Sequence, residues 1–114
     1  MSPGIDTTLL PLTFAPGPTD FTVLTMDGTT WVRDPRTPSP RDWHNLASVP
    51  GYPPAVSDVS AATASSPADS LLISVVTTGG VVAQTRCTLT APPPPPGLKW
   101  GATYCQPFKV VSPT

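Results

Sequence analysis

The chain has 114 residues and a mass of 11.8 kDa, which leaves room for one domain, residues 1–114. Only 11% of the residues are charged and the net charge is −1, so no basic field exists to attract nucleic acid or anionic lipid. The 18 prolines, the many Thr, Val and Ser residues and the scarcity of good helix formers argue against a helical bundle. The apolar runs are too short to cross a bilayer, so we expect no membrane span.

Neither the N-terminus nor the cysteines fix the compartment. Residues 1–6 contain no basic residue ahead of an apolar stretch, so we expect no secretory signal peptide and a cytoplasmic or non-classically secreted protein. His44 is the sole histidine of the sequence, so we expect no metal site and no cofactor. The sequence leaves two options for Cys87 and Cys105, namely a disulfide or two buried thiols.

Four strands are predicted in the first half of the chain, at 7–14, 21–26, 29–33 and 43–48. These segments are rich in β-branched and apolar residues, and turn residues bound them. Asp27 and Gly28 predict a tight hairpin between the second and third strands, because glycine supplies the positive φ that such a turn needs. Pro11 favours an edge or bulged position for the first strand.

The second half repeats the same order of signals, with predicted strands at 56–63, 71–77, 81–87 and 99–107. An offset of 51 residues places 16–28 on 67–79. Trp43 corresponds to Trp100 at the start of the last strand, at an offset of 57 because the five-proline loop 92–96 adds the excess. We therefore divide the domain into two blade-like repeats, residues 6–50 and 51–110. Four short antiparallel strands repeated at about 50 residues are typical of β-propeller blades.

Two blades cannot close a ring, because propellers usually have about four to eight. The uncovered sheet faces and strand edges of a two-blade chain predict a homo-oligomer, and a homotrimer would complete six blades. The predicted fold class is thus all-β, with two four-stranded antiparallel blades of a β-propeller completed by oligomerisation. The alternative is a β-sandwich or a small barrel, which closes without partners.

Several runs resemble a blade of the β-propeller lectins, namely 59–65, 71–80, 82–86 and Lys99-Trp100-Gly101. The chain also resembles the short bacterial and fungal fucose-binding lectins, in which about two blades per chain trimerise into a six-bladed ring. The resemblance implies a non-catalytic lectin with glycan pockets between its blades. Fucose sites of that family use an Arg, a Glu and a Trp, and this chain has no glutamate, so the resemblance does not imply fucose.

Aromatic rings with polar neighbours are the candidate sugar contacts, because sugars stack their C–H faces on rings while planar side chains bind the hydroxyls. The densest such group surrounds Trp43, and a sparser one, which includes Lys99 and Thr103, surrounds Trp100. The competing interpretation is that both tryptophans pack between blades; Trp31, which aligns with Val82, is expected in the core. The predicted carbohydrate-binding residues are Trp43, Trp100, Arg41, Asp42, His44, Asn45 and Tyr104.

Catalysis is not expected. Asp42 and His44 would share one face of a strand, and a carboxylate there could orient an imidazole. The sequence has no Gly-x-Ser-x-Gly nucleophile motif, however, and its seven aspartates offer no close pair for glycoside hydrolysis. The rival to a lectin is a structural or assembly protein that uses its sheet faces for protein–protein contacts.

Overall fold

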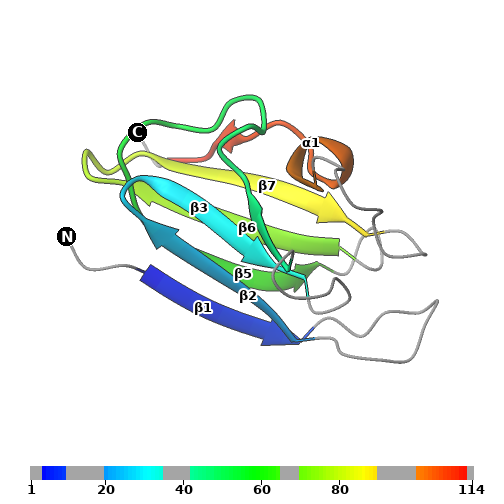
Figure 1. Cartoon of the computed structure of the whole chain (residues 1–114). Coiled ribbons are helices and arrows are strands. Elements are labelled where there is room, and N and C mark those ends of the chain that lie inside the picture. The colour runs from blue at the N-terminus through cyan, green and yellow to red at the C-terminus, as the bar shows by residue number, and fades with distance from the viewer. Residues whose placement is uncertain (1–3, 10–19, 35–41, 65–69, 90–99, 113–114) are drawn as a thin grey trace.

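Two four-stranded antiparallel sheets form the fold of the described residues (Figure 1). The structure is a computed structural model that describes residues 4–9, 20–34, 42–64, 70–89 and 100–112. The first sheet contains, in order, β1 (Gly4–Leu9), β2 (Asp20–Met26), β3 (Thr29–Arg33) and β4 (Trp43–Asn45). The second contains β5 (Val56–Ala64), β6 (Ser70–Thr77), β7 (Val82–Thr88) and β8 (Lys109–Val110), with the helix α1 (Trp100–Tyr104) between β7 and β8 in the chain. The predicted all-β class is confirmed.

Alternation of side chains along the strands builds one core between the two sheets. Phe21 and Val23 of β2 are fully buried, and so are Leu71 and Ile73 of β6, whereas the residues between them are partly exposed. Successive strand residues point to opposite faces, so these buried side chains all lie on the inner face of their sheet. The inner faces share a single hydrophobic cluster. Each sheet therefore keeps an outer face, which points away from this core.

The hairpin between β2 and β3 turns on Asp27 and Gly28, as predicted. Both residues have positive φ, 54° and 81° respectively. This is the pattern of a type I′ turn, whose twist matches that of the flanking strands. The register that follows pairs Leu24 with Trp31 and Val23 with Val32. It places Val32 in the core and Trp31 on the outer face, half-exposed, so the expectation of a core position for Trp31 is wrong.

The space between the sheets is narrow on one side and wide on the other. At the narrow side β5 lies against β1 and β2, and a Cβ placed on Gly4 would overlap the carboxylate of Asp58. At the wide side α1 lies against β4 and β7 and fills the space with the buried ring of Trp100. Of the predicted strand 7–14, residues 7–9 belong to β1, which begins earlier, at Gly4; residues 10–14, with Pro11, lie outside the described residues.

The predicted strand 99–107 is wrong for residues 100–104, which form α1; the chain meets β7 at an isolated bridge of Cys105 and then pairs with it at β8. The helix places Trp100 and Tyr104, four residues apart, on the same side, and both are buried. Their rings pack edge to face with centroids 5.3 Å apart. Burial of these two rings against the core outweighs the weak local preference of this segment for a strand.

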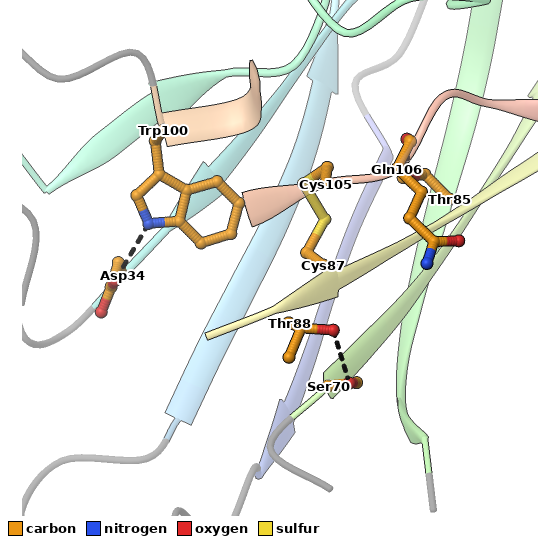
Figure 2. Close-up of a disulfide and its surroundings, with 8 residues drawn as sticks. All are labelled: Asp34, Ser70, Thr85, Cys87, Thr88, Trp100, Cys105 and Gln106. Atoms are coloured by element: carbon orange, nitrogen blue, oxygen red, sulfur yellow. Dashed lines mark hydrogen bonds between the residues drawn. A yellow bond between two sulfur atoms is a disulfide. The ribbon is translucent and has the colours of Figure 1, made fainter. Parts of the chain in front are cut away.

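Cys87 of β7 and Cys105, the residue after α1, form a disulfide (Figure 2). The two residues face each other as an isolated antiparallel bridge. Directly after it, the Gln106 backbone N–H donates to the Arg86 carbonyl oxygen at 2.9 Å. The sequence option of a disulfide is thus confirmed, and it attaches the C-terminal segment to β7.

Candidate functional site

The outer face of the first sheet gathers apolar and aromatic side chains of the described chain. Register places Ile5, Leu24, Trp31 and Asn45 in one row across the four strands. The next row places Arg33 beside Trp43. Ile5 is 66% exposed and Trp43 37% exposed. A row of large apolar groups on a half-exposed sheet face marks a surface available for binding.

Trp43 is the most accessible of the aromatic rings whose burial is described on this face. It lies on β4, the edge strand of the first sheet, and pairs with Arg33 of β3. Strand alternation points Trp43 and Asn45 outward and His44, between them, inward. An exposed indole on an edge strand offers a flat apolar surface that a small ligand can reach.

Arg33 and Asp42 form an ion pair next to Trp43. Arg33 Nε donates a hydrogen bond to Asp42 Oδ2 at 2.7 Å, and the side chains are 39% and 10% exposed. This hydrogen bond holds the pKa of the Asp42 carboxyl below its usual value of 3.8, although burial acts in the opposite direction. The pair fixes the plane of the guanidinium, which keeps further N–H donors at the side of the indole.

A hydrogen bond from the backbone orients the side chain of Asn45. Its Oδ1 accepts a hydrogen bond from the Ala47 backbone N–H at 2.7 Å, in the manner of an Asx turn. The side chain is exposed, on the same face as Trp43. With Oδ1 engaged, its Nδ2 is the group that can donate to a ligand. Arg41, which was predicted in the same cluster, lies outside the described residues.

Trp100, Tyr104 and His44 form an interior aromatic cluster. Trp100 is 2% exposed, and its Nε1 donates to Asp34 Oδ2 at 3.0 Å (Figure 2). The His44 ring stacks on the Trp100 ring with centroids 5.6 Å apart and an angle of 14° between the planes. Because packing surrounds the indole, Trp100 presents no ring face to solvent in the described structure. The two tryptophans that match in sequence thus lie in opposite environments.

The structure therefore divides the predicted site. Trp43 and Asn45 lie together on the outer face, and Asp42, although buried, stays beside them through its ion pair with Arg33. His44 points inward, and Trp100 and Tyr104 belong to the core. Sequence reasoning did not place Arg33 or Trp31 beside Trp43. The period of two in a strand puts positions 31 and 33 on the face opposite Val32, which is the burial that the structure shows. Because Trp31 and Val32 are both apolar, the sequence does not indicate which of the two faces is buried.

Other classes of site are not found in the part of the chain that the structure describes. Within these ranges no group of three or more His, Cys, Asp or Glu side chains could hold a metal ion. No helix among the described residues has the length and apolar character to cross a membrane. Comparisons with known proteins give no match: no family model, no curated protein and no solved structure matches this chain.

Proposed function

We propose that the protein is a non-catalytic carbohydrate-binding protein in which a sugar stacks on Trp43. The observation that carries the proposal is the 37% exposed indole on a flat sheet face, with Arg33 beside it on β3 and Asn45 two residues further along β4. An apolar ring flanked by fixed planar donors matches what a sugar presents, namely C–H faces edged by hydroxyls.

Each neighbour of Trp43 has a defined part in this proposal. Arg33, whose Nε is held by Asp42, donates its remaining N–H groups to sugar hydroxyls. Asn45 donates through Nδ2 while Ala47 holds its Oδ1. Both side chains are oriented before the ligand arrives, which reduces the entropy lost on binding.

The proposal extends to assembly into a homotrimer. Both sheets carry accessible apolar residues on their outer faces, with Ile5 and Met26 exposed on the first and Val82 half-exposed on the second. The sheets are close at β1 and β5 and further apart where α1 lies between them, a wedge shape that suits blades arranged around an axis. In such a ring the first sheet of one copy packs on the second sheet of the next through these apolar residues, and Trp43, on the edge strand β4, lies at the open rim of the pocket between them.

A glycan array tests sugar binding, and light scattering tests assembly. We expect the wild-type protein to give array hits that are lost in Trp43→Ala. We expect light scattering to give the mass of three chains. No hit for a folded wild-type protein would contradict the binding proposal. A folded monomer of 11.8 kDa would contradict the ring.

A structural protein that binds protein partners through its sheet faces is the second candidate. The observation that favours it is the apolar exposure of the first sheet, where Ile5 is 66% and Met26 48% exposed. The glycan array separates the candidates, because a structural protein predicts no hit for the folded wild-type protein. Substitution of Ile5 and Met26 by serine tests the face itself: it should lower the solution mass, and an unchanged mass would contradict this role.

A further inference from the structure

A cavity of about 450 Å³ lies on the outer face of the second sheet, on the opposite side of the molecule's core from Trp43. Its volume falls within the roughly 300–1,000 Å³ of small-molecule sites. It is formed between β7 and the segment that leads into β8. The described residues that line it are Leu72, Gln84, Thr85, Arg86, Gln106, Pro107, Lys109 and Val111.

The walls of this cavity are fixed by hydrogen bonds and by the disulfide. Gln106 donates its backbone N–H to the Arg86 carbonyl at 2.9 Å, and its own carbonyl oxygen accepts from Thr85 Oγ1. Cys105, bonded to Cys87, directly precedes it, and Figure 2 shows Gln106 and Thr85 side by side next to the disulfide. On the floor, Gln84 Nε2 donates to Ser74 Oγ at 2.9 Å. The cavity is therefore largely preformed.

The charge of the lining is positive. Arg86 and Lys109 are two of only six Lys and Arg residues in the sequence, and the described lining residues include no carboxylate. Register pairs Lys109 with Gln84, so Arg86 is its diagonal neighbour, at a spacing of about 7–8 Å between backbones. Arg86 already has an interaction within the protein, but a guanidinium carries five N–H donors and can contact a ligand as well. From neighbouring positions of one face, a guanidinium and an ammonium can both reach a single anionic group.

The rest of the lining suits the body of a sugar. Gln84 and Gln106 supply amide groups that can donate to and accept from hydroxyls. Leu72, Pro107 and Val111 supply apolar surface for C–H groups. The lining thus combines two cations, two amides and an apolar wall around one preformed volume.

We propose that this cavity binds a sugar that carries a carboxylate, a hexuronate, with Arg86 and Lys109 on the carboxylate. The planar guanidinium accepts a carboxylate in a bidentate fashion, and the amides bind the ring hydroxyls. The ligand class rests on the proposed carbohydrate-binding function, but the site differs from the surface around Trp43 and lies within one sheet of one chain.

Titration calorimetry of the full chain with galacturonate and with galactose, the matched neutral sugar, tests the inference. We expect galacturonate to bind, galactose to bind at least about tenfold more weakly, and the difference to shrink in high salt because screening weakens ionic contacts. Arg86→Gln and Lys109→Gln should each lower galacturonate affinity about tenfold or more, since each removes a charge-assisted hydrogen bond.

Equal affinity for the two sugars, or unchanged affinity in both folded cavity variants, would overturn the inference. Binding of acetate as tight as that of galacturonate would also overturn it, because the site would then recognise an anion without a sugar. The same measurements distinguish failure of this inference from failure of the proposed function. Array hits for neutral glycans together with no galacturonate binding reject this cavity alone, whereas galacturonate binding without neutral hits rejects the Trp43 site alone.

Discussion

Trp100 Nε1 donates a hydrogen bond to Asp34 Oδ2 at 3.0 Å, and so joins two buried residues that are 66 positions apart in the sequence. Asp34 follows β3 of the first sheet, and Trp100 begins α1 beside the second. A buried carboxylate requires donors, because burial without them costs several kcal/mol. This contact therefore fixes α1 and the space between the sheets, and it commits Trp100 to the core.

Trp100→Phe should destabilise the protein by about 1–3 kcal/mol, because it removes a donor from a buried carboxylate and leaves the ring site underfilled. Urea unfolding followed by circular dichroism measures the change. Trp31→Phe, at a half-exposed position on the outer face, is the matched control and should shift the free energy of unfolding by less than about 0.5 kcal/mol. Equal effects of the two substitutions would show that the Asp34 contact adds nothing.

Reduction of the Cys87–Cys105 disulfide should lower the free energy of unfolding by about 3 kcal/mol. The crosslink joins residues 18 positions apart, and closing a loop of this size restricts the unfolded chain. Thermal unfolding with and without dithiothreitol measures the loss. The double substitution Cys87→Ala with Cys105→Ala should match the reduced protein and be insensitive to reductant; a variant as stable as the oxidised wild type would contradict the prediction.

The Arg33–Asp42 pair should make stability depend on pH in acid. Its hydrogen bond lowers the pKa of folded Asp42 below the usual 3.8, so the unfolded chain takes up this proton at a higher pH than the folded one. The contribution of this pair to the free energy of unfolding is fully present above the pKa of Asp42 in the unfolded chain. It is lost as the pH falls through the lower pKa of Asp42 in the folded protein. Asp42→Asn should therefore be less stable than wild type at neutral pH, and the difference should narrow below pH 3.8. A difference that is constant over this range would argue against the pair.

Trp43→Ala should weaken binding of a neutral glycan by about 1–3 kcal/mol, which is roughly 5- to 150-fold, because it removes the stacking surface. Trp43→Phe keeps a ring and should retain most of the affinity. Calorimetry with a glycan identified on the array measures both. Equal affinity of the alanine variant and the wild type would remove Trp43 from the site.

The strands could be predicted from the sequence because their signals are local. The β-branched and apolar run 71–77 and the Asp27-Gly28 turn are recognised from neighbouring residues alone, and they match β6 and the β2–β3 hairpin. The option of a disulfide requires that the C-terminal segment run beside β7. The segment does so at Cys105, although a helix precedes that residue.

The environments of the tryptophans could not be predicted, because contacts distant in sequence decide them. Trp43 and Trp100 occupy matching places in the two halves, yet one is 37% and the other 2% exposed. The hydrogen bond to Asp34 holds the Trp100 ring in the core, and the disulfide at Cys105 fixes the end of α1, the helix that contains Trp100. The alignment of the two halves shows neither contact. It does not bring Asp34 to Trp100, and it pairs Cys105 with no cysteine, since the first half has none.

The side-chain N–H signals of the three tryptophans, followed by NMR during a glycan titration, test the central claim most directly, namely that a sugar binds on the outer face of the first sheet at Trp43. The account predicts that the Trp43 signal shifts in proportion to saturation, while the Trp100 signal, held by Asp34 in the core, stays in place. Assignment by Trp43→Phe and Trp100→Phe identifies each signal. A saturable shift confined to Trp100, or binding that moves none of the three signals, would contradict the account.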